Sequence, residues 1–438
     1  MSPPSQTTPA SSHYRWVICG LLFWVTTANY IDRGVFGNLA PELQKEIGWT
    51  SGQYWYMQVA FNAAYAVSLL VVGRLIDVVG LRWGFALACS FWGLASMSHS
   101  LASTVTGFFI CRILLALGEG GNFPAAIKTT AEWFPKRERA LATGIFNSGS
   151  NVGGLLVPLL LPFFITWLNN VYIGSHKIGW RGAFLVTGLF DILWIIAWLK
   201  IYKRPAQHPR VSPAELALIN SEPPEASVKI PWSRLFQFRQ AWSYVIGKFM
   251  TDCFWWFYLF GAPVFFAERF GTDLKGRMGP LATIYVLASF GSIGGGWLSG
   301  FFMKLGWTTN KSRKVTMLIC AACVFPVAFA TISDNIWISA TLIALAGAAH
   351  QAWSANLFSL ASDMFPRRVV ASVTGLGGMA GSIGGITLFL IVGYLKDSHI
   401  SYVPVFIAAS VAYLLALVII QLLSPKLEPA KIDEPQAA

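Results

Sequence analysis

One apolar stretch constrains the fold of this chain more than any other feature. It is long enough to cross a bilayer, yet it contains two charged side chains. The stretch covers residues 105–139 and carries Arg112 and Glu119 in its interior. A charge at the centre of a membrane helix costs about 2.5–3.5 kcal/mol even on insertion scales. The two residues are seven positions apart, which places them on one face of an α-helix. The stretch therefore predicts a membrane helix whose polar face is turned towards a protein interior.

The composition of the whole chain agrees with this interpretation. Of its 438 residues, 55% are hydrophobic and only 12% are charged, whereas a soluble domain carries about 25% charged residues. We therefore expect an all-α integral membrane protein in a lipid bilayer. The net charge of +12 is assigned to cytoplasmic loops rather than to nucleic-acid binding, because such loops are rich in Lys and Arg. The six Cys residues lie in apolar segments and predict neither disulfides nor a metal site.

Twelve apolar segments follow one another in two groups of six. The predicted spans are residues 14–38, 53–75, 83–101, 105–139, 141–168, 180–202, 241–268, 278–303, 315–332, 336–362, 370–395 and 402–423. The predicted regions are a disordered tail (1–13), an N-terminal six-helix domain (14–202), a cytoplasmic linker (203–240), a C-terminal six-helix domain (241–424) and a cytoplasmic tail (425–438). Lys and Arg concentrate on one side of this topology, which predicts that both termini are cytoplasmic.

The two halves contain similar sequences at matching places. Residues 134–137 (FPKR) correspond to residues 365–368 (FPRR), 231 positions later, and the Gly pair at 153–154 recurs at 384–385 with the same spacing. Repeats in the same orientation are typical of transporters whose halves are related by an axis along the membrane normal. The same spacing places His350 opposite Glu119, so a titratable residue is predicted at this place in each half.

Further intramembrane polar residues are candidates for function. Asp32 and Arg33 form a second charged pair at the end of the first span. Buried ion pairs are poor stabilisers, because desolvation offsets their Coulomb attraction, so a functional role is favoured over a structural one. Lys248 and Asp252, four positions apart, fit a helix-internal ion pair as well as a cavity role. Asp191 has no evident partner and is left unassigned.

One helix of the second half is rich in hydrogen-bonding groups. We predict that His350, Gln351 and Asn356 line a cavity and contact hydroxyl groups, because lipid-facing surfaces cannot carry such side chains. Asn147 is a weaker candidate of the same kind. Trp255 fits stacking on a ring of a bound ligand, although packing or interfacial roles are commoner for tryptophan.

The motif Gly73-x-x-x-Asp77-x-x-Gly80-x-Arg82 resembles the signature of the major facilitator superfamily. Within it, the chain resembles the anion:cation symporter family and, more narrowly, its hexuronate transporters. The stretches that carry this narrower resemblance are residues 29–33, 118–153, 248–260 and 350–368.

The resemblance implies proton-coupled uptake of a sugar acid by a twelve-helix protein with two pseudo-symmetric halves. The roles that it implies are proton coupling for Asp32 and Glu119, substrate-carboxylate binding for Arg33, a counter-ion role for Arg112, and cavity lining for Tyr30 and Tyr65. Asp77 and Arg82 are expected to lock a cytoplasmic gate. The chain departs from the family at Cys253, where Pro is frequent, and at residues 261–264, where a Trp-Leu-Pro-Lys sequence is frequent.

These observations predict a secondary transporter that imports a monoanionic hexuronate, such as glucuronate or galacturonate, with protons by alternating access in the cell inner membrane. A symporter for an aldonate or another organic anion is the close alternative. A membrane-embedded enzyme or receptor is less consistent with the sequence, since no nucleophile–base set or extramembrane domain is evident. No cofactor is expected.

Overall fold

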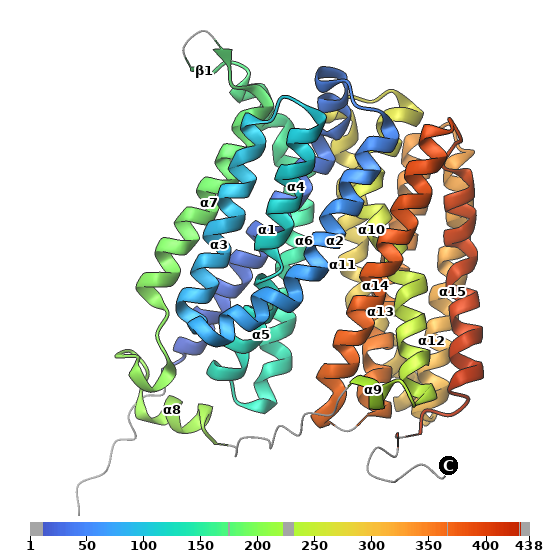
Figure 1. The fold of residues 1–438 in the computed structure, drawn as a ribbon. Coiled ribbons are helices and arrows are strands. Elements are labelled where there is room, and N and C mark those ends of the chain that lie inside the picture. The colour runs from blue at the N-terminus through green and yellow to red at the C-terminus, as the bar shows by residue number, and fades with distance from the viewer. Residues whose placement is uncertain (1–11, 174–175, 222–231, 366, 429, 431–438) are drawn as a thin grey trace, which may run out of the picture.

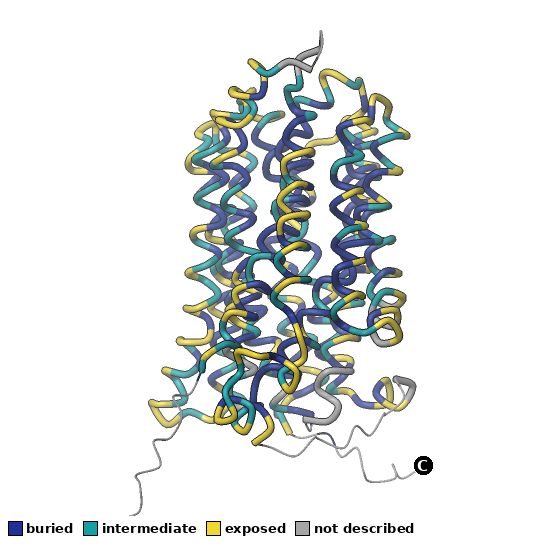
Figure 2. Tube along the Cα trace, turned by 90° about the vertical axis from the view of Figure 1, so that its left-hand side faces the viewer, coloured by how far each residue is buried: buried dark blue, intermediate teal, exposed yellow. Residues whose placement is uncertain are grey.

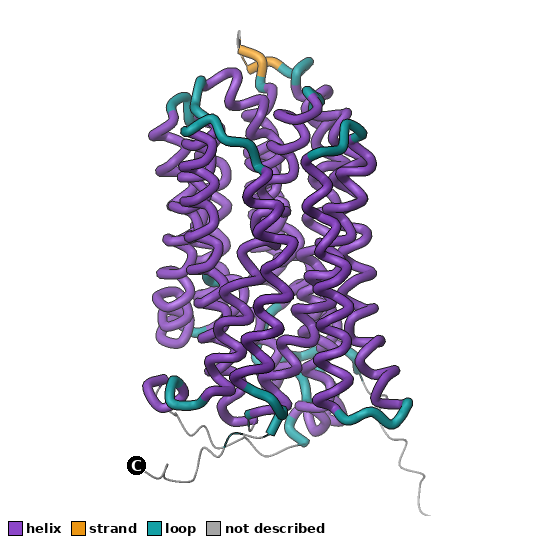
Figure 3. Tube along the Cα trace, turned by 90° about the vertical axis from the view of Figure 1, so that its right-hand side faces the viewer, coloured by secondary structure: helices purple, strands orange, loops and turns teal. Residues whose placement is uncertain are grey.

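The computed structural model describes residues 12–173, 176–221, 232–365, 367–428 and 430, and these are almost entirely helical (Figures 1 and 3). Residues 1–11, for which the sequence predicts disorder, lie outside the described residues. The helices are α1 (Tyr14–Ile47), α2 (Ser51–Val79), α3 (Leu81–Ser98), η1 (His99–Leu101), α4 (Val105–Glu119), α5 (Asn122–Trp133), α6 (Lys136–Leu168), α7 (Gly179–Ile201), η2 (Pro205–Gln207), α8 (Pro213–Ile219), α9 (Trp232–Leu235), α10 (Arg239–Phe270), α11 (Leu274–Lys304), α12 (Thr309–Val324), η3 (Phe325–Thr331), α13 (Ile336–Met364), α14 (Arg367–Asp397) and α15 (Val403–Leu423). The strands β1 (Tyr172–Ile173) and β2 (His176–Lys177) form an antiparallel pair.

Each predicted span corresponds to one long helix or to two consecutive helices. The third span is divided into α3 and η1, the fourth into α4 and α5, and the ninth into α12 and η3. Seven of the described helices are long and apolar enough to cross a membrane by length and composition alone. α4 does not reach that length, because it stops after 15 residues. The break in the fourth span was not predicted, and it positions the site described below.

The helices form two bundles that stand side by side (Figure 1). In the first bundle α1 packs on α6, α3 on α7 and α2 on α4; in the second α10 packs on α14 and α15, and α11 on α13. Between the bundles, α2 contacts α14, α6 contacts α11 and α1 contacts α10. Buried positions line the inner faces of these helices, and many exposed positions are apolar, as expected of surfaces that face lipid (Figure 2).

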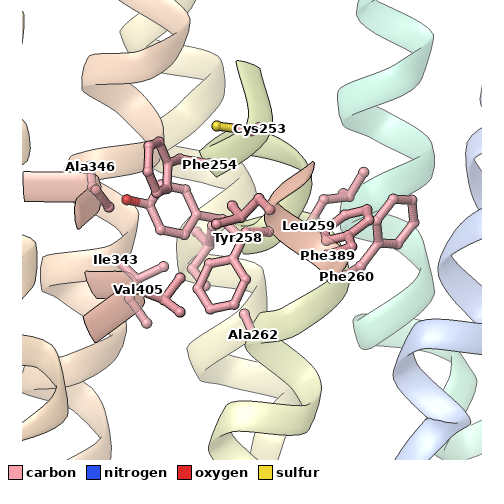
Figure 4. Packing of buried hydrophobic residues seen from close by; sticks show 14 of the residues in the cluster. Cys253, Phe254, Tyr258, Leu259, Phe260, Ala262, Ile343, Ala346, Phe389 and Val405 are labelled. Carbon is pink, nitrogen blue, oxygen red and sulfur yellow. The ribbon is translucent and has the colours of Figure 1, made fainter. Parts of the chain in front are cut away.

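α10 is held by aromatic packing on several sides. Figure 4 shows Tyr258 beside Ile343 and Val405, while Phe260 lies with Phe389 on the side nearer the first bundle. The ring centroids of Phe260 and Phe389 are 6.2 Å apart. This packing fixes the helix that also carries Lys248 and Asp252.

Polar contacts join the two bundles at the end that includes β1. Arg277 at the start of α11 forms an ion pair with Glu42 near the end of α1, with an N–O distance of 2.7 Å. The Tyr54 hydroxyl donates to the Phe260 carbonyl at 2.7 Å, and the Ser51 hydroxyl to Glu268 at 2.9 Å. The bundles are therefore joined at the end opposite the linker.

The start of α1 is capped by Glu215, a residue of the short linker helix α8. Glu215 is buried, and its carboxylate accepts hydrogen bonds from the backbone N–H groups of Tyr14 and Arg15, both at 3.1 Å, and from the Ser12 hydroxyl. Arg15 Nη1 adds an ion pair at 2.9 Å. His13, the residue before α1, provides no side-chain cap of its own. Burial alone would raise the pKa of Glu215, but these hydrogen bonds outweigh it and hold the pKa below its usual value.

Glu215→Gln is expected to loosen the start of α1. A glutamine has one acceptor oxygen and no charge, so the change should cost about 1.5–3 kcal/mol locally, the worth of hydrogen bonds to a charged group. The stabilisation by Glu215 should be present at neutral pH and be lost as the pH falls through its lowered pKa. Hydrogen–deuterium exchange of the first turn of α1 measures this effect. The exposed Glu428, changed to Gln, is the control; equal exchange in both variants would contradict the capping role.

Candidate functional site

The polar site of the first bundle is positioned by the break between α4 and α5. α4 ends at Glu119, and α5 begins at Asn122. The glycines around the break allow close packing on α3: a Cβ atom at Gly118 would lie 2.6 Å from the backbone nitrogen of Trp92, and one at Gly121 would lie 2.8 Å from the Cβ of Ala88. Larger residues would push the fourth span away from α3. The break thus places Glu119 at a helix end inside the bundle.

Glu119 is paired with Arg33 of α1. Arg33 Nε donates to Glu119 Oε2 at 2.5 Å, and the two side chains are only 2% and 0% exposed. Among the described residues, Arg33 Nη2 and Glu119 Oε1 have no hydrogen-bond partner. The ion pair therefore leaves the Nη2 group of the cation and one oxygen of the anion without a hydrogen-bond partner among the described residues.

Aromatic rings surround the Arg33 guanidinium. Its carbon lies 4.5 Å from the ring centroid of Tyr65, 5.2 Å from that of Tyr30 and 5.4 Å from that of Phe61. Such cation–π contacts hold a guanidinium in a desolvated place at modest cost. The structure thus brings together Tyr30, Arg33 and Tyr65, all candidates from the sequence. Phe61 was missed, although its position one turn before Tyr65 on α2 was an available signal.

Arg112 acts on Glu119 through its charge but forms no direct ion pair with it among the described residues, so its expected counter-ion role stays a prediction. Its Nη2 donates to Gln58 at 2.9 Å, and its guanidinium lies 4.0 Å from the Phe61 ring. Seven residues rise about 10 Å along a helix, so Arg112 and Glu119 share a face but lie too far apart for a direct ion pair. Arg33 reaches Glu119 from the neighbouring helix instead.

Asp32 points into a different part of the bundle. Its Oδ1 accepts a hydrogen bond from Ser96 of α3 at 2.8 Å, and the residue is 1% exposed. Successive residues on a helix are about 100° apart, so Asp32 and Arg33 diverge. Asp32 and Arg33 therefore do not pair with each other as their adjacency suggested. Asp32 contacts Ser96, and Arg33 contacts Glu119.

In the second bundle, an ion pair and a stacked pair lie on α10 and α13. Lys248 Nζ and Asp252 Oδ2 are 2.5 Å apart. His350 Nδ1 lies 2.8 Å from the Tyr413 hydroxyl, and the His350 ring stacks on Trp255 with centroids 5.5 Å apart and planes at 6°. His350 and Trp255, predicted separately from the sequence, are therefore direct neighbours.

The remaining candidates do not join these groups. Asn147 is exposed and Gln351 is half-buried. Arg82 Nη2 donates to the Leu199 carbonyl at 2.5 Å. The side chain of Asp77, the other expected gate residue, lies outside the described structure.

Asn356 forms a contact between two helices of the second bundle. It is fully buried, and its amide nitrogen donates to the carbonyls of Gly295 at 3.0 Å and Ala352 at 2.9 Å. The side chain thus ties α13 to α11 and has no amide hydrogen left for a ligand. Polar residues on membrane helices serve helix–helix contacts as well as cavities, and the cavity-lining role of Asn356 stays a prediction.

Asn356→Ala is therefore expected to lower stability by about 1–3 kcal/mol, since two buried carbonyls lose a donor. The ratio of affinities for a ligand and its deoxy analogue should stay unchanged. Thermal unfolding and binding titrations of purified protein measure both quantities. Gln351→Ala is the matched comparison on the same helix, expected to preserve stability. A selective loss of affinity for the hydroxylated ligand in Asn356→Ala would instead support the predicted cavity-lining role.

Comparison with known proteins adds independent information. The sequence model of the Major Facilitator Superfamily matches residues 22–389. A hexuronate transporter of Escherichia coli (strain K12) is 31% identical over 413 residues, which cover 93% of each chain. A D-galactonate transporter of Escherichia coli O6:H1 is 28% identical over 418 residues, covering 91% of this chain and 92% of the relative.

A solved structure shares the arrangement of helices. It is a bacterial homolog of the human lysosomal transporter Spinster in an inward-facing and occupied conformation, with a TM-score of 0.72. The alignment covers 95% of this chain and 98% of that chain at 18% sequence identity. At this identity the similarity concerns the fold alone.

Proposed function

Because this chain belongs to the Major Facilitator Superfamily, we propose that it is a proton-coupled symporter that imports a monoanionic sugar acid by alternating access. The family makes it a multi-pass membrane transporter rather than an enzyme. The proposed substrate is a hexuronate such as glucuronate or galacturonate, because the relative that is 31% identical over nearly the full length is a hexuronate transporter. The proposed location is the cell inner membrane, with both termini cytoplasmic.

The observation that carries the proposal is the unused donor of Arg33. Its guanidinium is permanently charged and buried, and Nη2 has no partner among the described residues. A carboxylate binds a guanidinium through two parallel hydrogen bonds, a geometry that favours arginine over lysine. A sugar acid offers one such carboxylate. Arg33 is therefore the proposed substrate anchor, between Tyr30 and Tyr65.

The same ion pair supports a coupling mechanism. A substrate carboxylate that binds Arg33 competes with Glu119 for the guanidinium, since Glu119 occupies Nε. Once displaced, a buried carboxylate without a counter-ion is strongly unfavourable, and uptake of a proton neutralises it. Proton binding to Glu119 and substrate binding to Arg33 thus favour each other, and by linkage the coupling is reciprocal.

Contacts between the bundles support alternating access. The polar contacts around Arg277, Glu42 and Tyr54 close the proposed external end. Transport would require them to break while the linker end closes, a change in which Asp77 and Arg82 are the proposed gate. In the second bundle, Trp255, His350 and Gln351 are proposed to contact the sugar, and Asn147 and Arg112 are proposed to line the path.

An uptake screen in liposomes tests the substrate. Purified protein should accumulate labelled glucuronate or galacturonate when the external pH is lower, and protein-free liposomes should not. The second candidate is an aldonate, favoured by the similarity to a D-galactonate transporter. Uptake of galactonate without uptake of either hexuronate would establish that alternative; chemical conversion of the ligand without movement would contradict transport altogether.

We expect at least two protons per cycle, because Asp32 and Glu119 are both buried within the first bundle. Two protons with a monoanion move one net positive charge inward, and each charge gains about 2.3 kcal/mol per 100 mV. A potential set with valinomycin, negative inside, should therefore stimulate uptake at equal internal and external pH. An unchanged rate would contradict the two-proton stoichiometry while leaving transport itself intact.

A further inference from the structure

Asp191 is a buried acid that the proposed cycle does not use. It lies on α7 with 0% of its surface exposed, and neither carboxyl oxygen has a hydrogen-bond partner among the described residues. An ionised carboxylate in such a place is strongly unfavourable, because its water has been removed and no donor replaces it. The surroundings must therefore provide a counter-charge or a proton.

The packing of α3 on α7 brings Asp191 to Asp32. A Cβ atom at Gly93 would lie only 3.1 Å from the Cβ of Asp191, so the absence of a side chain there makes room for the acid. One turn away, the Ser96 hydroxyl lies 3.1 Å from the Thr187 hydroxyl and donates to Asp32 Oδ1 at 2.8 Å. Asp32 enters this layer from α1, and the two carboxyls lie within side-chain hydrogen-bonding reach of each other.

The groups around the two carboxyls do not supply a free counter-charge. Arg33 on α1 acts on Asp32, but its Nε is committed to Glu119 of α4, and the negative charge of Glu119 itself acts on Asp191. On α3 the titratable neighbour is Cys89. Trp92 on α3 is close enough to interact with Asp191, yet its indole N–H completes no hydrogen bond among the described residues. A proton is the remaining means of satisfying the pair.

We propose that Asp32 and Asp191 share one proton and titrate as a single unit. One carboxyl is then an acid whose O–H donates to an oxygen of the other, and the pair carries one negative charge instead of two. Two carboxylates in contact repel each other, and such pairs lose their protons in two separate steps that belong to the pair. The inference deepens the proposed function, because it makes Asp191 the second half of the proton site assigned to Asp32.

Infrared spectroscopy tests the shared proton without requiring transport. A protonated carboxyl has a C=O stretching band that an ionised carboxylate lacks. The measurement uses the full chain carrying Glu119→Gln, so that Glu119 contributes no carboxyl band. At neutral pH we expect one protonated-carboxyl band in this protein. With Asp191→Asn added, the amide donates to Asp32 and stabilises its ionised form, so that band should be lost.

Controls separate proton sharing from packing. Thr187→Val removes a hydroxyl that interacts with Asp32 at the same interface; loss of a donor does not favour the ionised form, so the band should be retained. Should Asp191→Asn fail to fold, Asp191→Ser keeps a donor in a smaller volume and should likewise lose the band. An equal band with and without the Asp191 carboxyl would overturn the proposal. If the wild-type protein does not transport sugar acids, the proposed function is contradicted. The infrared result can still be interpreted, because it does not depend on transport.

Discussion

Replacing Glu119 with glutamine is expected to uncouple substrate movement from the proton gradient. Glutamine mimics a permanently protonated glutamate, so Arg33 loses its competing anion. Exchange of labelled for unlabelled substrate should continue, because the anchor and the conformational change remain. Accumulation against a gradient should be lost. A pH difference of one unit is worth about 1.4 kcal/mol per proton, so each uncoupled proton removes a tenfold accumulation.

Counterflow and pH-driven uptake in the same liposomes measure the two activities separately. Glu46→Gln is the matched control, since Glu46 lies on α1 with a side chain 49% exposed and in contact with Arg181. Its accumulation should equal that of the unmodified protein. Full pH-driven accumulation by Glu119→Gln would exclude Glu119 as a coupling site, whereas loss of exchange as well would indicate a role in substrate binding or folding.

Arg33→Lys is expected to weaken substrate binding strongly while preserving the charge. Lysine cannot form two parallel hydrogen bonds to a carboxylate and has no planar group to lie against Tyr65. Loss of a hydrogen bond to a charged group costs about 1.5–3 kcal/mol, which corresponds to an increase in Kd of roughly ten- to a hundredfold. Equilibrium binding of the purified protein gives this value directly.

The control for Arg33→Lys is Arg181→Lys, because Arg181 also contacts an aromatic ring and a glutamate but is partly exposed. Its effect on Kd should be negligible. Combining Arg33→Lys with Glu119→Gln sharpens the test: if the two residues compete as proposed, removing Glu119 should recover part of the lost affinity. Near-normal affinity in Arg33→Lys alone would exclude the guanidinium as the anchor.

The order and approximate places of the apolar spans were predictable from the sequence, whereas the break between α4 and α5 was not. The membrane admits only segments whose backbone groups are satisfied internally, so each crossing must be an apolar helix of sufficient length. The predicted family and the all-α fold are confirmed by the match over residues 22–389 and by the solved structure that covers 95% of the chain. Charged residues within these spans also indicated which helices carry the site.

The partners of those charges were decided by the tertiary structure. Sequence spacing relates residues on one helix, and it favoured Arg112 for Glu119 and Arg33 for Asp32. Helix packing instead joins Arg33 to Glu119 and commits Asn356 to the backbone of α11.

Asp191 shows most clearly that sequence spacing does not reveal contacts between helices. No partner is evident near it in the sequence, yet it lies against Asp32, 159 positions earlier. Such contacts depend on the rotation of each helix about its axis and on where glycines such as Gly93 and Gly118 allow neighbouring helices to approach. Hydropathy determines that a helix crosses the membrane, and side-chain packing between helices determines which of its faces meet.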